Sequence, residues 1–92
     1  MSLIDIRHRH TLNAQAARAL VDDMAASLAH KYSTTHTWHE DTLTFKRPGV
    51  DGSIVLDGDE VRVRARLGML LAPMRPTIER EIQRLLADRF TA

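Results

Sequence analysis

The chain of 92 residues contains no cysteine. That absence excludes a disulfide framework, a metal site built on thiolates, and a thiol nucleophile. The N-terminal segment carries the acidic Asp5 where a signal peptide would have a basic start and a long apolar run. The longest apolar run, residues 67–74, is too short for a transmembrane segment. We therefore expect a cytoplasmic protein, which also fits the lack of cysteine.

Aromatic residues are also few, and the positive and negative charges nearly balance. The aromatic side chains are Tyr32, Trp38, Phe45 and Phe90. The core must therefore rest on aliphatic residues and methionine. Thirteen Lys and Arg against 12 Asp and Glu give a net charge of +1, which by itself gives no reason to expect a polyanionic partner. The length predicts a single domain over residues 1–92.

Two segments have the three- and four-residue spacing of an amphipathic helix. In residues 14–32 the apolar stripe is Ala17, Leu20, Val21, Met24, Leu28 and Tyr32. A final helix begins at Pro76, because proline suits the first helical turn. Its stripe is Ile78, Ile82, Leu85, Leu86 and Phe90.

Five segments read as strands, and they are residues 3–9, 35–40, 42–47, 53–56 and 60–67. Pro48-Gly49 indicates a loop, and Asp57-Gly58 predicts a hairpin turn of type I′. The order β-α-β-β-β-β-α predicts an α+β protein, in which an antiparallel sheet of about five strands carries two helices on one face. If the C-terminal helix lies across a curved sheet, the arrangement is helix-grip-like.

Four segments in a fixed order carry a resemblance to a known family. They are His10-Thr11-Leu12, the stretch 45–52, the stretch Leu67-Gly68-Met69-Leu70-Leu71, and Ile78-Glu79 with Glu81-Ile82. Together they resemble the polyhydroxyalkanoic acid system family, small bacterial proteins encoded beside polyester-granule genes. The resemblance implies a role around polyhydroxyalkanoate granules and supplies no catalytic residues. The chain departs from the family at Met69, where members often carry an aromatic residue.

The apolar run 67–74 lies between the last predicted strand and the final helix. The run has no charged residue and is longer than one strand end needs to bury. The candidate contact residues are Leu67, Met69, Leu70, Leu71 and Met74. They would bind a granule surface, acyl or lipid material, or a granule-associated protein, and methionine suits such adaptable contacts. Two alternatives remain, a homodimer through the same residues or simple closure of the thin core by Leu70 and Leu71.

Arginines occupy the outward positions of two predicted strands. They are Arg7 and Arg9 in the first strand, and Arg62, Arg64 and Arg66 in the last. Such a basic face would orient the protein on an anionic interface. The alternative function is a nucleic-acid-binding regulator, although an RNA-binding sheet would place aromatics on that face. Trp38 and Phe45 are instead predicted to lie on the core-facing side of the sheet. The arginines also have a simpler explanation, because charged residues on an exposed strand discourage pairing with the edge of another sheet.

No residues form a recognisable catalytic or metal-ligating pattern. Asp22 and Asp23 are adjacent on a helix and diverge, and there is no Gly-rich phosphate loop. His36 and His39 face opposite sides of a strand, so they cannot share a zinc ion. We therefore predict no enzymatic activity, no catalytic residue, no metal and no cofactor. We expect His10 to hydrogen-bond the backbone where the first strand gives way to the helix.

Overall fold

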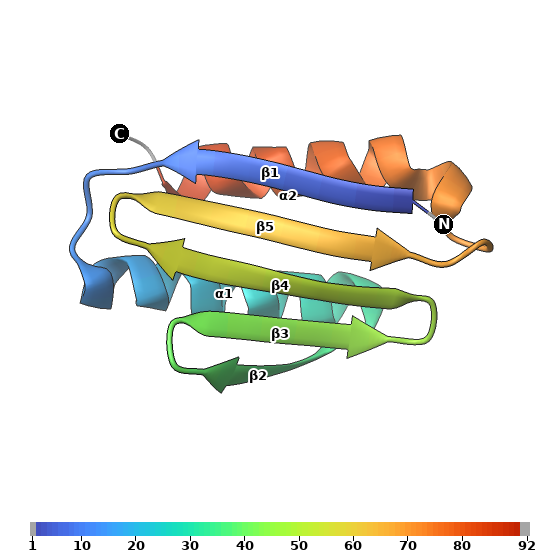
Figure 1. Ribbon diagram of the computed structural model, residues 1–92, viewed down its shortest axis with the longest axis horizontal. Helices are drawn as coiled ribbons and strands as arrows, with labels where there is room; N and C mark the ends of the chain where they lie inside the picture. The colour runs from blue at the N-terminus through green and yellow to red at the C-terminus, as the bar shows by residue number, and fades with distance from the viewer. Residues whose placement is uncertain (1, 91–92) are drawn as a thin grey trace.

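The computed structural model describes residues 2–90 and has the predicted α+β class and order of elements (Figure 1). The elements are β1 (Ser2–Arg9), α1 (Ala14–Tyr32), β2 (Thr35–His39), β3 (Thr42–Arg47), β4 (Val50–Asp57), β5 (Glu60–Leu67), the short 3₁₀ helix η1 (Ala72–Met74) and α2 (Arg75–Arg89). Within this part of the chain, the two α-helices lack the combined length and apolarity that a bilayer crossing requires.

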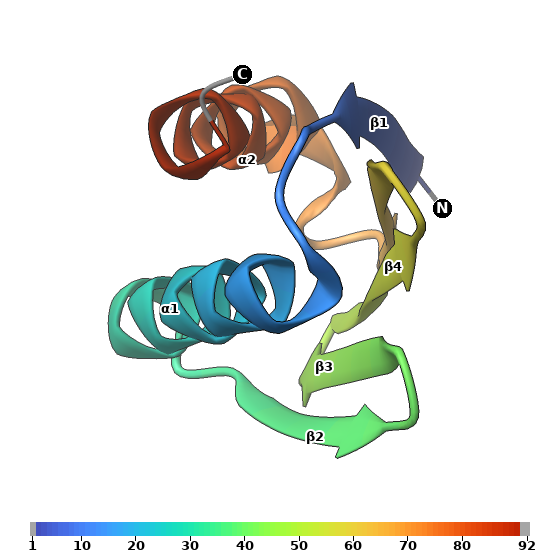
Figure 2. The same cartoon turned by 90° about the vertical axis from the view of Figure 1, so that its left-hand side faces the viewer.

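The strands form one antiparallel sheet in the order β1-β5-β4-β3-β2, so that β1 and β2 are its edges. The register places apolar residues opposite one another, such as Ile6 and Ile54 on either side of Val63. Because side chains alternate along a strand, this register gathers the apolar positions on one face. Both helices cover that face, and the other face is left to solvent (Figure 2).

Local signals fix both ends of α1. The side chain of Asn13 accepts a hydrogen bond of 2.8 Å from the backbone N–H of Ala16, which satisfies one free donor of the first turn. At the other end Ser33 takes a left-handed conformation with φ of 57°, and its N–H donates to the carbonyl of Ala29. These caps explain why the predicted boundaries of this helix are confirmed.

The two helices share the apolar face. Figure 1 shows α2 behind β1 and β5, and α1 behind β4 and β3. The C-terminal helix lies mainly against β1 at one edge of the sheet, and α1 covers the remaining part of the face. The core between the layers contains Ile4, Val21, Met24, Leu43, Ile54, Val61, Val63, Leu67, Ile82, Leu86 and Phe90 among its fully buried side chains.

Two sequence predictions about turns need correction. We predicted a strand over residues 53–56, but β4 already begins at Val50, because Pro48-Gly49 is a two-residue turn and pairing with β3 starts at once. We also predicted a type I′ turn at Asp57-Gly58. The two residues between β4 and β5 are Gly58 and Asp59, and only Gly58 has a positive φ, of 61°. A glycine at the first central position is the pattern of a type II′ turn.

Candidate functional site

A tight turn follows β5, and we call residues 67–74 the apolar tip. The carbonyl of Gly68 accepts hydrogen bonds from the N–H groups of Leu71 at 3.1 Å and Ala72 at 2.9 Å. The N–H of Gly68 donates to the carbonyl of Gly49 at 2.8 Å, which ties the turn to the connection between β3 and β4. The backbone of the tip is therefore hydrogen-bonded internally and anchored, and the residues between Gly68 and Leu71 lie at its outer end.

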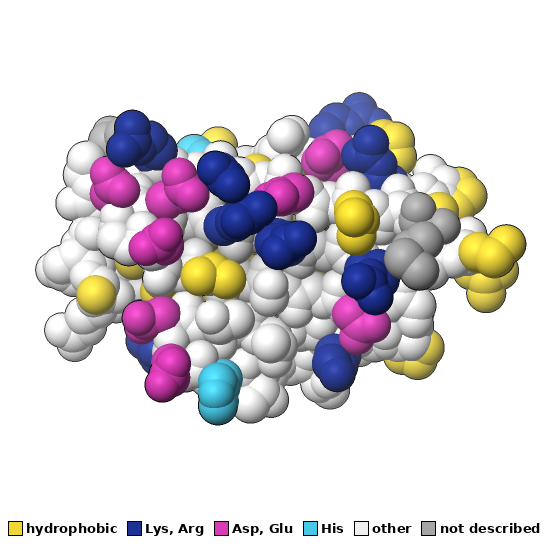
Figure 3. Space-filling model, viewed as in Figure 1, with side chains coloured by type: hydrophobic (Ala, Val, Ile, Leu, Met, Phe, Trp, Pro, Cys, Tyr) yellow, Lys and Arg dark blue, Asp and Glu magenta, His cyan; other side chains and the backbone are white. Residues whose placement is uncertain are grey.

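The five predicted contact residues divide into exposed and buried groups. Met69 is 85% exposed, Leu70 is 94% exposed and Met74 is 43% exposed. Leu67 is fully buried in the core, and Leu71 is partly buried against it. Core closure thus accounts for Leu71 and not for Leu70. Figure 3 shows hydrophobic side chains gathered at the end of the molecule where β5 ends.

A small apolar cavity of about 80 Å³ lies behind the apolar tip. Its walls come from the inner sheet face, the last turns of α1 and the first turns of α2. They are Leu28, Tyr32, Thr34, Phe45, Arg47, Val50, Ala65, Leu67, Leu71, Met74, Ile78 and Ile82. Three of the predicted contact residues, Leu67, Leu71 and Met74, therefore line this cavity.

Two polar side chains accompany this cavity. Arg47 donates from Nη1 to the carbonyl of Tyr32 at 3.0 Å and from Nε to the carbonyl of Pro48 at 3.3 Å. The hydroxyl Oγ1 of Thr34 is buried and has no hydrogen-bond partner within residues 2–90. A buried hydroxyl without a partner is uncommon, because the lost hydration costs about 1–3 kcal/mol.

Charge is distributed unevenly about the tip. Arg66, Met69 and the acidic Asp51 line one depression on the surface. Lys46 and Arg47 end the neighbouring strand β3, and Arg75 begins α2, where it forms an ion pair of 3.2 Å with Glu79. The opposite end of the sheet carries the acidic β4–β5 turn, and Figure 3 shows acidic side chains gathered there. Basic side chains therefore outnumber acidic ones around the apolar tip, and Asp51 and Glu79 lie among them.

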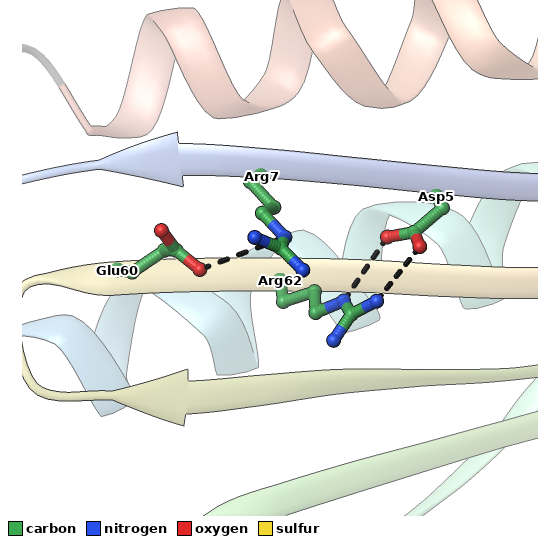
Figure 4. A network of polar contacts seen from close by, with 4 residues as sticks. All are labelled: Asp5, Arg7, Glu60 and Arg62. Carbon is green, nitrogen blue, oxygen red and sulfur yellow. Dashed lines mark hydrogen bonds and ion pairs between the residues drawn. The ribbon is translucent and has the colours of Figure 1, made fainter.

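The predicted basic face is partly neutralised by carboxylates (Figure 4). Asp5 accepts two hydrogen bonds from Arg62, at 3.1 and 2.8 Å. The hydrogen bonds from Arg62 lower the pKa of Asp5 below its ordinary value of 3.8, and partial desolvation opposes this. Two longer or more exposed pairs are Arg7 with Glu60 at 3.9 Å and Arg9 with Asp59 at 3.2 Å.

Arg64 and Arg66 remain as the two arginines of this face without an ion pair inside residues 2–90. Both are exposed. Phe45 is buried on the opposite, helix-covered face, and Trp38 packs against the core there. A nucleic acid on this face would therefore meet two arginines without an ion pair. In the described part of the sheet, no Phe, Tyr or Trp of a strand lies on this face for a base to stack on. Both points weaken the alternative function, a nucleic-acid-binding regulator.

Two of the histidines, His8 and His10, lie within hydrogen-bonding distance of backbone groups. The N–H of Leu12 donates to Nδ1 of His10 at 3.1 Å, which confirms the expected contact at the end of β1. A ring nitrogen of His8, Nε2, lies 3.0 Å from the carbonyl oxygen of Phe90. Within residues 2–90, no three or more His, Asp or Glu side chains lie together as a metal site would require.

The comparisons with known proteins give one match. The model of the family described as "Putative polyhydroxyalkanoic acid system protein" matches residues 4–90. Neither the curated proteins nor the solved structures include a significant match to the chain. The matched range contains β5, the apolar tip and both helices, so the candidate site lies inside the family's domain.

Proposed function

Because the chain belongs to the polyhydroxyalkanoic acid system protein family, we propose that it is a non-catalytic accessory protein of polyhydroxyalkanoate storage that attaches to the granule surface through the apolar tip. The observation that carries this proposal is the exposure of Met69 and Leu70, at 85% and 94%, on an anchored turn. Large aliphatic side chains held outward in this way favour contact with an apolar surface.

The expected attachment is reversible. Burying a leucine or methionine side chain stabilises a complex by roughly 1.5–3 kcal/mol, so Met69 and Leu70 together contribute about 3–6 kcal/mol. Each basic residue near an anionic surface adds about 1 kcal/mol, and Arg66 stands next to Met69. Association itself costs several kcal/mol in lost motion, which leaves a modest surplus.

The ion pairs of the structure support a non-catalytic role. Asp5 and Glu60, which could serve as acids or bases elsewhere, face arginines on the open sheet surface. The cavity behind the tip has mainly apolar walls, and no Asp, Glu or His is among the described residues that line it. Acid–base catalysis needs such a group within reach of a bound substrate.

Sedimentation with artificial polyester granules tests the proposal. We would compare the wild type with Met69→Asp/Leu70→Asp at low and high salt. The matched control is Gln15→Asp/Ala19→Asp, which adds the same charge at two exposed positions in the first turns of α1, away from the tip. Circular dichroism must show that all three proteins are folded.

The expected result is that the wild type and the control pellet with the granules at both salts, while the tip variant stays in the supernatant. Wild-type protein that stays in the supernatant at both salts would contradict direct surface attachment. Pelleting only with granules that carry their own proteins would indicate a granule protein as the partner instead. Binding that high salt abolishes would assign the contact to the arginines of the basic face.

A further inference from the structure

We infer that the cavity behind the apolar tip binds the short alkyl chain of a monocarboxylic acid, whose carboxylate is held at the mouth by Arg47. This site goes beyond the proposed function, because a soluble acid can bind there whether or not the tip attaches to a granule. The inference rests on the size of the cavity, its apolar walls and the two polar groups at its edge.

The size of the cavity limits the length of the chain. Its volume is about 80 Å³, roughly half of the ~150 Å³ cavity that accommodates benzene in another protein. A chain of about three or four carbons fits that space. Ala65 contributes a small side chain to one wall, where β5 passes under the cavity. A larger residue at this position would occupy the space.

The walls are buried at one end of the cavity and partly exposed at the other. Leu28, Phe45 and Leu67 are buried, whereas Tyr32, Thr34, Arg47 and Met74 are partly or largely exposed. The latter four therefore form the mouth. An alkyl chain would enter between them and replace contacts that the cavity walls otherwise lack.

Arg47 is placed to bind a carboxylate. Its guanidinium is held by the carbonyls of Tyr32 and Pro48 through Nη1 and Nε. Its Nη2 donates to no atom of residues 2–90, so this nitrogen can donate to a ligand. A guanidinium that is already held in place loses little side-chain freedom on binding, which favours a charge-assisted hydrogen bond.

Thr34 provides a second polar group at the mouth. Its Oγ1 is buried without a partner among the described residues, and the residue lines the same cavity. A rotation of this side chain about χ1 would let the hydroxyl donate to a ligand oxygen in the cavity. The cavity walls include no acidic side chain in the described chain, so nothing there repels a carboxylate.

Titration with butyrate, followed through the amide signals of labelled protein by NMR, tests the inference. Acetate is the ligand control for chain length, and 1-butanol is the control for the carboxylate. Ala65→Val fills the cavity, Arg47→Gln removes the charge, and Thr34→Val removes the hydroxyl at nearly constant volume. Arg64→Gln is the control variant, because Arg64 is an exposed arginine away from the cavity.

We expect butyrate to shift the amides of Thr34, Ala65 and Leu71, and acetate or 1-butanol to bind at least about tenfold more weakly. Ala65→Val should abolish the shifts. Arg47→Gln should weaken binding about tenfold, and Arg64→Gln should leave it unchanged. No shift at the cavity with tens of millimolar butyrate would overturn the inference, as would equal weakening by Arg47→Gln and Arg64→Gln.

The readouts remain separate from granule attachment and from folding. Ala65→Val leaves the exposed tip intact and should still pellet with granules, while Met69→Asp/Leu70→Asp should still bind butyrate. If Ala65→Val does not fold, Arg47→Gln and Thr34→Val carry the test, because both change the mouth and leave the buried walls as they are. Wild-type protein that binds butyrate but does not pellet with granules would contradict the proposed function alone.

Discussion

The ring of Phe45 lies directly over Gly52, its partner across strands β3 and β4. A Cβ atom at Gly52 would lie only 2.2 Å from Cζ of Phe45, which is closer than packed carbon atoms can approach. Phe45 is 5% exposed, and its ring packs in the core on the helix-covered face of the sheet. Glycine is required here because an aromatic ring covers the strand.

Gly52→Ala should therefore lower the free energy of unfolding by about 1–3 kcal/mol, since the methyl group forces the ring out of its place in the core. Urea unfolding measures the change. In a Phe45→Leu background the same substitution should cost clearly less, because the smaller side chain leaves room. Additive effects of the two substitutions would show that the clash is not the cause.

This pair also explains one limit of the sequence prediction. Pro48-Gly49 indicated a loop, and the next strand was predicted to begin only at Ser53. In the structure only Pro48 and Gly49 form the turn, and β4 begins at Val50. The role of Gly52 depends on a ring from another strand, and a tertiary contact of this kind leaves no local pattern.

Strongly periodic segments were predictable. The alternation of Val61, Val63 and Ala65 with arginines gave β5 its correct bounds and faces, because burial on one face of a sheet imposes a period of two. The ion pair between Asp5 and Arg62 was not predicted. Its partners are far apart in the chain and meet only because β1 pairs with β5 in this register.

The candidate site was predictable only in outline. The absence of charge in residues 67–74 indicated a contact surface, but composition does not distinguish an exposed leucine from a buried neighbour. The difference between Leu70 and Leu71 arises from the hydrogen-bonded turn at Gly68. The cavity forms only where the ends of two helices meet the sheet, so no local sequence pattern describes it.

The Asp5–Arg62 pair predicts a pH dependence with a definite sign. Because the hydrogen bonds of Arg62 lower the folded-state pKa of Asp5, the pair stabilises the fold fully above the ordinary value of 3.8. That contribution is lost as the pH falls through the lowered pKa. NMR titration of the Asp5 carboxyl should show a pKa below 3.8 in the wild type and closer to 3.8 in Arg62→Gln.

Arg7→Gln is the matched control for this titration, because Arg7 acts on Asp5 only through a weaker Coulombic effect. It should move the pKa of Asp5 less than Arg62→Gln does. Added salt should reduce the difference between wild type and Arg62→Gln, since the pair lies on the open face of the sheet. An Asp5 pKa that is the same in wild type and Arg62→Gln would show that the pair does not persist in solution.

His10 should contribute more to stability than any exposed histidine. It is 3% exposed, accepts a hydrogen bond from the N–H of Leu12 and packs against Phe90 with ring centroids 5.3 Å apart. His10→Ala leaves that N–H without its acceptor and opens a cavity, so it should cost about 2–4 kcal/mol. Urea unfolding measures this, and faster hydrogen exchange at the Leu12 amide should accompany it.

Two further variants define the role of His10. His10→Asn keeps an acceptor close to the position of Nδ1 and should cost less than His10→Ala. His39→Ala changes an exposed histidine of β2 and should stay within about 0.5 kcal/mol of the wild type. If His10→Ala and His39→Ala cost the same, the contact at the end of β1 does not hold the fold.

The adjacent leucines of the tip should separate stability from surface binding. Leu70 is 94% exposed, so Leu70→Ala should change the free energy of unfolding by less than about 0.5 kcal/mol. Leu71 packs against the core, and its Cδ1 would lie 3.3 Å from a Cβ at Gly49, so Leu71→Ala should cost about 1–3 kcal/mol. Urea unfolding of the two variants under one set of conditions makes the comparison.

Equal costs for the two substitutions would mean that the tip folds back onto the body of the protein in solution, and that Leu70 is not available to a surface. If Leu71→Ala lowers the free energy of unfolding more than Leu70→Ala does, the granule-binding results of charged variants at the two positions have different meanings. A charge at Leu71 would then disturb the core and the granule contact together. A charge at Leu70 would change only the surface, so loss of granule binding by a folded Leu70→Asp variant can be assigned to the apolar tip itself.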